Sequence, residues 1–175
     1  AQAAAPGITG PSFDLVAAAG FSNQPDGATV YSWGYGCNAL PTGFAPTAIA
    51  TGSCVAGEMQ LPGPTLIVNQ GQTVTVTLHN NLPAAAGNTS ILFPGFTLTA
   101  SSGAAGLLTA EATPLGTASY TFVATNAGTH TYYSGTQGDL QIEMGLYGAI
   151  VVLPSSTPSA CTSGLAAANR RVEQH

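Results

Sequence analysis

The sequence predicts an all-β domain of the sandwich or barrel type. Short segments rich in β-branched and aromatic residues recur along the chain, and turns containing Gly or Pro separate them. No segment shows the 3.6-residue period of an amphipathic helix. At 175 residues the chain can bury one sizeable core. We therefore expect an extended N-terminal arm at residues 1–12, one domain at 13–154, and a C-terminal tail or linker at 155–175.

The domain is expected to open with a pair of strands followed by a closed loop. The strands are Phe13–Phe21 and Ala28–Gly36, and the turn-forming stretch "NQPDG" separates them. Cys37 and Cys54 bracket the loop, and in an oxidising compartment they most simply form a disulfide, because their spacing suits no Cys-x-x-Cys motif. Cys161 is then left as a free thiol, an intermolecular link, or the mate of a cysteine outside this chain.

The clearest strand pattern lies in the middle of the chain. Thr65–Val68 is a short apolar strand, a turn follows at Asn69–Gly71, and Thr73–Asn80 then alternates between apolar and polar residues. The alternation places Val74, Val76 and Leu78 on one face, which is typical of a half-buried strand. Three further strands are expected at residues 118–125, 128–135 and 145–154.

The charge content excludes several functions. Asp, Glu, Lys and Arg together make up 5% of the chain, against about a quarter in an ordinary soluble domain. There is no lysine, and two adjacent arginines cannot neutralise a phosphate backbone, so we expect no nucleic-acid partner. No apolar run approaches the roughly 18 residues of a membrane helix. The first residues, "AQAAAPG", are typical of a chain cut by a signal peptidase, which predicts a secreted protein, extracellular or on the cell surface.

Several segments, taken in their order, suggest a family. They are Asp26–Gly36, Leu61–Pro83, Ser90–Phe96, Tyr120–Gly135 and Gly145–Pro154. The Pro-Gly-Pro-Thr segment with its Asn-Gln-Gly turn and the closing Gly-Leu-Tyr-Gly strand are the specific parts. With these segments the chain resembles the N-terminal cupredoxin domain of the multicopper oxidases, such as laccases. The resemblance implies a cupredoxin-like Greek-key β-sandwich or barrel.

In that family this domain supplies two His-x-His pairs to a trinuclear copper cluster. Aligned on the flanking residues, the four ligand positions fall on Leu92, Pro94, Tyr133 and Gly135. Leu, Pro and Gly side chains have no donor atom, and one tyrosine cannot replace four imidazoles. A type 1 copper site needs a Cys beside two His, which this sequence does not place together. We therefore expect no copper cofactor, no metal site and no catalytic residue.

The three histidines are better explained without a metal. His79 lies in the alternating strand, on the face opposite its apolar residues, and we interpret it as a polar-face histidine. His130 is expected to be exposed, on the opposite strand face from the ligand position at Tyr133. His175 is terminal.

Other residues that could carry chemistry also have plainer interpretations. Asp139 and Glu143 are interpreted as solvated loop acids, and Met59 and Met144 as residues that fill gaps in a core. Asn88 begins an Asn-Thr-Ser triplet, which is an acceptor pattern for glycosylation. A set of aromatic residues is expected to form the core or, where exposed, a contact surface: Phe93, Phe96, Tyr132, Tyr133 and Tyr147.

Three functions remain open. The first is a non-catalytic structural domain that assembles with copies of itself into an extracellular filament or surface layer, because a surface of low charge is cheaply buried. The arm at residues 1–12 could then pair with a neighbour's sheet edge, and Cys161 could add a covalent link. The second is the first domain of a longer multicopper oxidase with a degenerate trinuclear site. The third is an extracellular module that binds a ligand or glycan.

Overall fold

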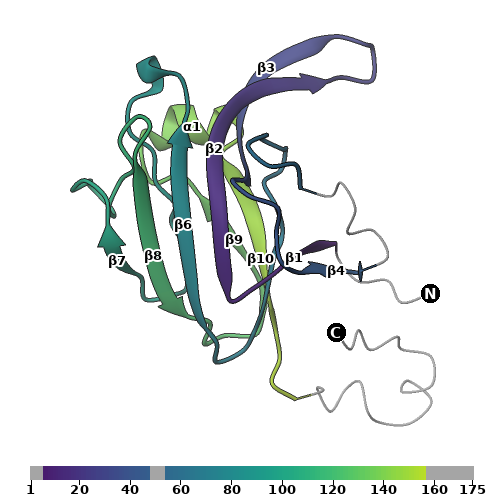
Figure 1. Ribbon diagram of the computed structural model, residues 1–175, viewed down its shortest axis with the longest axis vertical. Coiled ribbons are helices and arrows are strands. Elements are labelled where there is room, and N and C mark those ends of the chain that lie inside the picture. Colours follow the sequence, from purple (N-terminus) through teal and green to yellow (C-terminus); the bar gives the residue numbers. More distant parts are fainter. Residues whose placement is uncertain (1–5, 48–53, 157–175) are drawn as a thin grey trace.

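The computed structural model describes residues 6–47 and 54–156, which form two five-stranded sheets packed face to face (Figure 1). In the first sheet the strand order is β4 (Phe44–Ala45), β1 (Gly7–Thr9), β5 (Leu66–Asn69), β10 (Tyr147–Leu153) and β9 (Gly128–Tyr133). In the second sheet it is β3 (Thr29–Cys37), β2 (Ser12–Asn23), β6 (Thr73–Asn81), β8 (Thr117–Val123) and β7 (Thr99–Ser102). The predicted all-β sandwich is confirmed.

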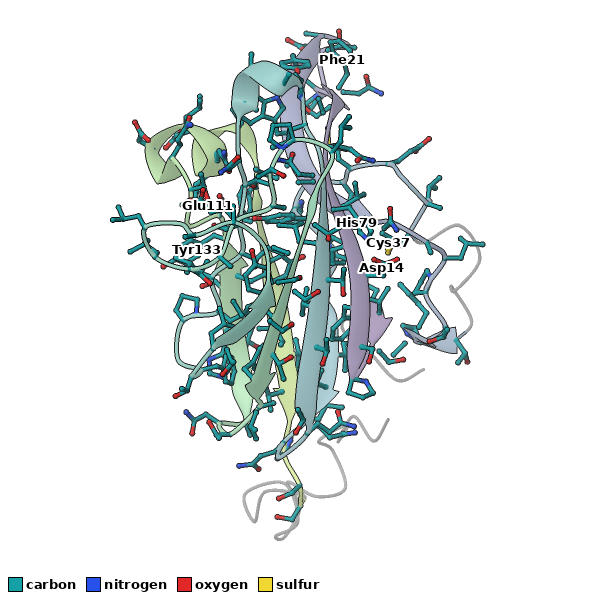
Figure 2. The ribbon with its side chains drawn as sticks, turned by 60° about the vertical axis from the view of Figure 1, so that its left-hand side comes forward. Asp14, Phe21, Cys37, His79, Glu111 and Tyr133 are labelled. Atoms are coloured by element: carbon teal, nitrogen blue, oxygen red, sulfur yellow. A yellow bond between two sulfur atoms is a disulfide. The ribbon has the colours of Figure 1, made fainter. Side chains whose placement is uncertain are left out.

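Both sheets mix parallel and antiparallel pairs. Strand β5 runs parallel to β1 and to β10, and β2 runs parallel to β6, whereas the remaining neighbours are antiparallel. The pairing of β2 with β6 ends at Ala18 and Asn81, but its pairing with β3 continues to Asn23 and Thr29. The end of the β2–β3 hairpin therefore projects beyond the sandwich, with Phe21 near its tip (Figures 1 and 2).

The alternation read from the sequence sets the packing of β6. Val74, Val76 and Leu78 are fully buried between the sheets, and the threonines between them face outward. On the outer face Thr77 Oγ1 lies 3.3 Å from Ser119 Oγ on β8, directly across the strand pair. One face is thus apolar and the other hydroxylated, as expected for a half-buried strand.

Three buried tyrosines tie loops to the core. The hydroxyl of Tyr35 donates to the carbonyl of Ser90, that of Tyr132 to Pro64, and that of Tyr120 to Ala110, at 2.6–2.7 Å. Each buried phenol therefore keeps a hydrogen-bond partner, which avoids the cost of an unpaired polar group. Burial also raises the pKa of all three phenols above the usual range of tyrosine, because the charged phenolate would be desolvated.

The described part of the N-terminal arm belongs to the sandwich. Strand β1 at Gly7–Thr9 pairs with β4 on one side and β5 on the other, so these residues are not free to pair with a neighbouring chain. Glycine is required at position 7, because a Cβ atom there would collide with the carbonyl oxygen of Thr65. The expectation that this stretch reaches a neighbour's sheet edge is therefore wrong for residues 7–9, although they are extended.

Two short helices are also found within residues 54–156. A 3-10 turn, η2, occupies Ala84–Ala86, and one α-helix, α1, occupies Gly138–Met144. The expectation that Asp139 and Glu143 lie on a loop is therefore wrong, because both belong to α1. Seven residues make only two turns, too few to show a helical period in the sequence. Gly145 ends the helix in a left-handed conformation, with φ of 120°. Both acids remain exposed to solvent.

Candidate functional site

The ligand positions implied by the resemblance come together in the fold. Leu92 and Tyr133 are paired in an isolated β-bridge: the N–H of Leu92 donates to the carbonyl of Tyr133 at 2.8 Å, and the N–H of Tyr133 donates back at 3.2 Å. Gly135 lies against the Leu92 side chain, and Pro94 lies exposed two residues further along. Segments 90–96 and 133–137 are therefore neighbours here, although about 40 residues separate them in the sequence.

The side chains at these positions do not fit a copper cluster. A Cβ atom built at Gly135 would lie 2.8 Å from Cγ of Leu92 and 3.0 Å from its Cδ1, so the leucine fills the room that a larger side chain at Gly135 would need. Neither Leu92, Pro94 nor Gly135 offers a donor atom. In residues 6–47 and 54–156, no three His, Cys, Asp or Glu side chains gather closely enough to hold a metal. No step involving copper can be derived from this arrangement.

A chain of hydrogen bonds joins the two segments directly behind Leu92. The N–H of Gly135 donates to Ser90 Oγ at 3.2 Å, and Thr136 Oγ1 donates to a carboxylate oxygen of Glu111 at 2.8 Å. Ser90 Oγ and Thr136 Oγ1 lie 2.9 Å apart. Because the only hydroxyl proton of Thr136 goes to Glu111, Ser90 must be the donor of that bond. The three hydrogen bonds therefore point in one direction, from the N–H of Gly135 through Ser90 and Thr136 to the carboxylate of Glu111.

Gln141, fully buried on α1, extends the same network. Its Oε1 accepts from the hydroxyl of Thr89 at 2.9 Å and from that of Ser134 at 2.7 Å. Its Nε2 donates to the carbonyl of Asn88 at 2.8 Å. One glutamine side chain thus ties the segment before Leu92, the segment after Tyr133 and the helix together. Among the described residues, no buried side-chain nitrogen or oxygen lacks a hydrogen-bond partner.

Sequence reasoning missed this network. Neither Glu111 nor Gln141 stands in a recognisable motif, and each reaches its partners across at least 23 residues of sequence, apart from the bond to Ser134. One signal was present: Thr89 and Ser90 directly precede the apolar run at residues 91–93, and Ser134 directly follows β9. Buried hydroxyls require partners, so their presence predicted polar residues nearby without identifying them.

Asn88 also belongs to this network. Its Nδ2 donates to a carboxylate oxygen of Glu111 at 3.0 Å, and its side chain is only partly exposed. Nδ2 is the atom that an N-linked glycan would occupy. A glycan at Asn88, as the sequence pattern suggests, would therefore compete with the contact to Glu111.

The two described histidines lie outside the network. Nε2 of His79, on the outer face of β6 as expected, lies 2.8 Å from Oδ1 of Asp14, whose other oxygen accepts from the side chain of Asn38. His79 and Asp14 are both partly exposed, and such surface pairs contribute about 0–1 kcal/mol. Figure 2 shows this pair on the opposite side of the view from Glu111 and Tyr133. His130, which was expected to be exposed, is half-buried because its ring packs 4.7 Å from that of Phe96, and its Nε2 bonds to the carbonyl oxygen of Asn126.

The methionines and aromatic residues serve packing. Met59 contacts Gly20 and Gly34, where added Cβ atoms would lie 2.8–3.0 Å from its side chain, and Met144 packs against the core. Phe93 and Tyr132 are buried in the core with ring centroids 5.8 Å apart, whereas Tyr147 is 44% exposed. Phe93 and Tyr132 therefore belong to the core, as expected, whereas the expected contact surface for exposed aromatics stays a prediction.

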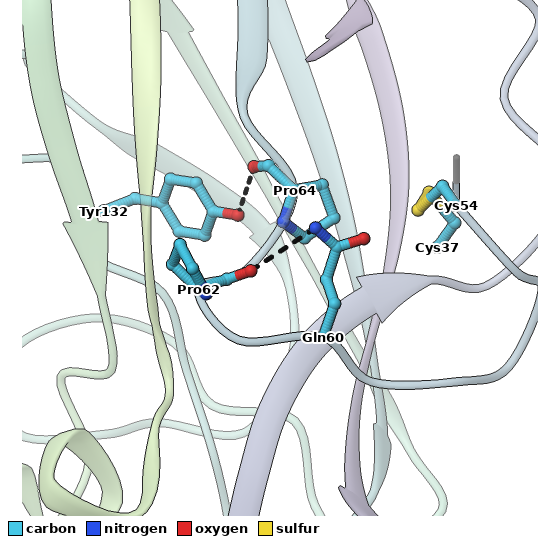
Figure 3. The surroundings of a disulfide bond; sticks show 6 residues. All are labelled: Cys37, Cys54, Gln60, Pro62, Pro64 and Tyr132. Carbon is cyan, nitrogen blue, oxygen red and sulfur yellow. Dashed lines mark hydrogen bonds between the residues drawn. A yellow bond between two sulfur atoms is a disulfide. The ribbon is translucent and has the colours of Figure 1, made fainter. Parts of the chain in front are cut away.

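Cys37 and Cys54 are joined by a disulfide, with Cα atoms 5.8 Å apart (Figure 3). Both cysteines are buried in the core, close to the segment in which Gln60 Nε2 donates to the carbonyl of Pro62 and Pro64 accepts from Tyr132. The disulfide therefore ties Cys54 to the end of β3, near the segment at residues 60–64 that leads into β5. Cys161 and His175 lie outside the described residues.

No helix among residues 6–47 and 54–156 is long and apolar enough to cross a membrane.

The family model and the curated relative that match this chain are both described as multicopper oxidases. The family model described as multicopper oxidase matches residues 43–157, more than half of the chain. Multicopper oxidase CTB12 of Cercospora beticola is 35% identical over 95 residues, which cover 53% of this chain and 14% of that protein.

Solved structures share the fold. The multi-copper oxidase of Pseudomonas thermotolerans superposes with a TM-score of 0.63 and 23% identity, covering 86% of this chain and 31% of that one. Another multicopper oxidase gives 0.59 at 26% identity, with 84% and 44% covered. The copper nitrite reductase of Nitrosomonas europaea gives 0.56 at 22% identity, with 85% and 42% covered. The chain spans about a seventh of the curated relative and less than half of these structures.

Proposed function

This chain belongs to the multicopper oxidase family, and from that premise we propose that it is a non-catalytic cupredoxin domain whose copper-ligand loops have become structural. The observation that carries the proposal is the contact between Leu92 and Gly135, at two of the four ligand positions. The leucine packs where the family's fold would present imidazoles, and no donor atom replaces them.

The hydrogen-bond network supports the same role. In a metal site the ligands hold the two segments to one another through the metal. In this chain Ser90, Thr136 and Gln141 make direct links between them, through neutral groups and one carboxylate. Among the described residues every buried side-chain nitrogen and oxygen has a hydrogen-bond partner, so none of them requires a metal as its partner. The two segments can therefore keep their positions without copper.

Copper titration tests the proposal. The chain, unfolded and refolded with excess Cu(II) and then desalted, is expected to retain less than one copper per molecule by elemental analysis, with no protein-bound copper signal by paramagnetic resonance. A variant carrying Leu92→His, Pro94→His, Tyr133→His and Gly135→His is the comparison. Stoichiometric copper retained by the natural chain would overturn the proposal.

We further propose that the domain is secreted and assembles with copies of itself, as a subunit of an extracellular filament or surface layer. The Cys37–Cys54 disulfide is compatible with an oxidising compartment, and charged residues make up only 5% of the chain. A surface poor in charge loses little solvation energy when it is buried between subunits. Electron microscopy of the native material tests this proposal: ordered fibres or lattices are expected, and dispersed particles would contradict it.

The length of the related proteins favours a second candidate function. The relatives are two or more times longer than the part this chain matches, so this segment would serve as the first domain of a longer copper-dependent oxidoreductase. Its role there would be to support the fold, with copper bound by other domains. Purification of the protein from its natural source discriminates the two, by its mass and its copper content.

A further inference from the structure

Asp26 and Gly27 lie in the exposed turn at the tip of the β2–β3 hairpin (Figure 1). The sequence contains three aspartates, and Asp26 is the only one that glycine follows. No atom outside Gly27 and its two chain neighbours lies within 4 Å of a Cβ built at this glycine. The backbone nitrogen of Gly27 is therefore open to the carboxyl group that precedes it, with no side chain of its own to screen it.

A hydrogen bond holds the Asp26 side chain beside this nitrogen. The N–H of Ala28 donates to Asp26 Oδ1 at 3.0 Å, which makes an Asx turn. Because the carboxyl group reaches the residue two positions on, its Cγ must lie alongside the peptide unit that joins Asp26 to Gly27. The N–H of Gly27 donates to the carbonyl of Gln24 at 2.9 Å, so its proton points away from the carboxyl group. A nucleophile and its electrophile are thus adjacent within one turn.

The N–H of Ala28 also favours attack on the carboxyl carbon. When a nitrogen adds to Cγ, negative charge develops on the carboxyl oxygens, and an N–H already bonded to Oδ1 is a preorganised donor for that charge. The other two aspartates are placed differently. Asp14 lies within β2 with its oxygens bonded to His79 and Asn38, and Asp139 lies within α1. Leucine follows both of them.

We propose that the folded turn converts Asp26 to isoaspartate without an enzyme. The nitrogen of Gly27 bonds to Cγ of Asp26, and a carboxyl oxygen leaves as water with the proton of that nitrogen and the proton of the carboxyl group. The product is a succinimide ring. Water then opens the ring. Breaking the bond from Gly27 N to the main-chain carbon of Asp26 leaves isoaspartate, whereas breaking the new bond restores aspartate. A water molecule is lost and another is gained, so the mass of the chain does not change.

The modification is confined to the tip of the hairpin. Isoaspartate carries the main chain through its side-chain carbon, which lengthens the turn and disturbs the bonds that Gln24 makes with Gly27 and Ala28. Strand β2 leaves β6 at Ala18, so this turn lies beyond the sandwich and the core is not affected (Figure 1). The inference concerns the chemistry of the chain itself and does not depend on the proposed function.

Peptide mapping of the aged protein tests the inference. The chain is kept folded in neutral buffer at physiological temperature for several weeks, then denatured and cut with chymotrypsin. Cleavage after Phe21 and Tyr31 releases residues 22–31, in which Asp26 is the only aspartate. A second form of this peptide, of equal mass and labelled by an isoaspartyl methyltransferase, is expected to accumulate. The peptides that contain Asp14 and Asp139 should stay unlabelled.

Two variants and a free peptide test the part played by the turn. Asp26→Glu keeps the charge but would need a larger ring, so no labelled form should appear. Ala28→Pro removes the N–H that bonds to Asp26 Oδ1 and should slow the conversion about threefold or more. A synthetic peptide of residues 22–31, which lacks the folded hairpin, should also react about threefold or more slowly than the folded chain.

Circular dichroism and thermal melting check that the aged chain and both variants stay folded. Absence of isoaspartate at Asp26 overturns the inference, and so does equal labelling at Asp139, since the damage would then be general. A free peptide that reacts as fast as the folded chain overturns it as well, because the turn would then contribute nothing. That comparison needs no variant, so it decides the matter even where Ala28→Pro alters the hairpin.

Discussion

Leu92 and Tyr133 hold each other through two backbone hydrogen bonds, of 2.8 and 3.2 Å, in an isolated antiparallel bridge at the end of β9. Because these bonds use only main-chain atoms, the pairing does not depend on which side chains the two positions carry. The chain could therefore exchange both side chains and still keep its two loops in register. Imidazole ligands could therefore be replaced at these two positions while the fold was kept.

Replacing Gly135 by alanine should destabilise the domain. The added methyl group would lie 2.8–3.1 Å from three carbons of Leu92, which is closer than carbon atoms normally pack. We expect the free energy of unfolding to fall by about 1–3 kcal/mol, the usual cost of overpacking. Urea denaturation followed by circular dichroism measures the change.

Two comparisons isolate the cause. Gly138→Ala is the control, because its new methyl group would meet only Ile142 Cδ1, at 3.6 Å, and should leave the stability within about 0.5 kcal/mol. Combining Gly135→Ala with Leu92→Ala should recover part of the loss, giving a coupling of at least about 0.5 kcal/mol in the double-mutant cycle. Strict additivity would contradict the contact.

Replacing Gln141 by leucine should lower the free energy of unfolding, because the network around Gln141 would lose its hydrogen-bond partner. The leucine has a similar size, but it leaves the hydroxyl of Thr89 without its acceptor and the carbonyl of Asn88 without its donor. Unpaired buried polar groups cost about 1–3 kcal/mol each, so for these two groups we expect a loss of about 2–6 kcal/mol in chemical denaturation. Glu143→Gln, on the exposed side of the same helix, should change stability by less than about 0.5 kcal/mol. A loss equal in both variants would mean that the network adds nothing.

The strands could be predicted because their signal is local. In β6 the alternation of Val74, Val76 and Leu78 with threonines specifies the strand and its buried face within a few residues. For Leu92 and Tyr133 the resemblance supplied only the alignment with ligand positions, and the β-bridge that joins them comes from the structure. Where the pattern is local, as in β6, prediction and structure agree.

The features that escaped prediction depend on contacts distant in sequence. Strand β1 is three residues long and is specified by its neighbours β4 and β5, not by its own alternation. Gln141 reads as an ordinary polar residue, and only the fold brings Thr89 to it from 52 residues away. The apolar type of Leu107 does not show that its side chain is 93% exposed. These three cases share one cause: the sequence shows a residue's type but not its neighbours.

Removing the Cys37–Cys54 disulfide should weaken the domain without changing its fold. The bond closes a loop with a sequence separation of 17, and the chain-entropy estimate for a loop of this size is about 3 kcal/mol. The double variant Cys37→Ala/Cys54→Ala should therefore lose about 3 kcal/mol in urea denaturation, and reduction of the natural chain should shift its midpoint similarly. An unchanged midpoint after reduction would show that the bond does not constrain the unfolded chain.

Alkaline pH should unfold the domain through its buried tyrosines. Burial raises the pKa of Tyr35, Tyr120 and Tyr132 in the folded state, whereas the unfolded chain releases these protons near pH 10. Above about pH 10 the unfolded state therefore binds fewer protons than the folded state, so stability is complete below that pH and falls as pH rises. Each tyrosine contributes a slope of up to about 1.4 kcal/mol per pH unit.

Urea denaturation between about pH 8 and pH 12 measures this slope, and tyrosinate absorbance should appear together with the loss of near-ultraviolet circular dichroism. Tyr120→Phe removes one of the three phenols and should lower the slope by about a third, while it also removes the bond to Ala110 and so lowers stability at every pH. The two effects separate, because the first changes the slope and the second displaces the whole curve. Complete ionisation of the tyrosines in a chain that keeps its circular dichroism would contradict the burial of these phenols, since a phenolate cannot remain between the sheets without a partner.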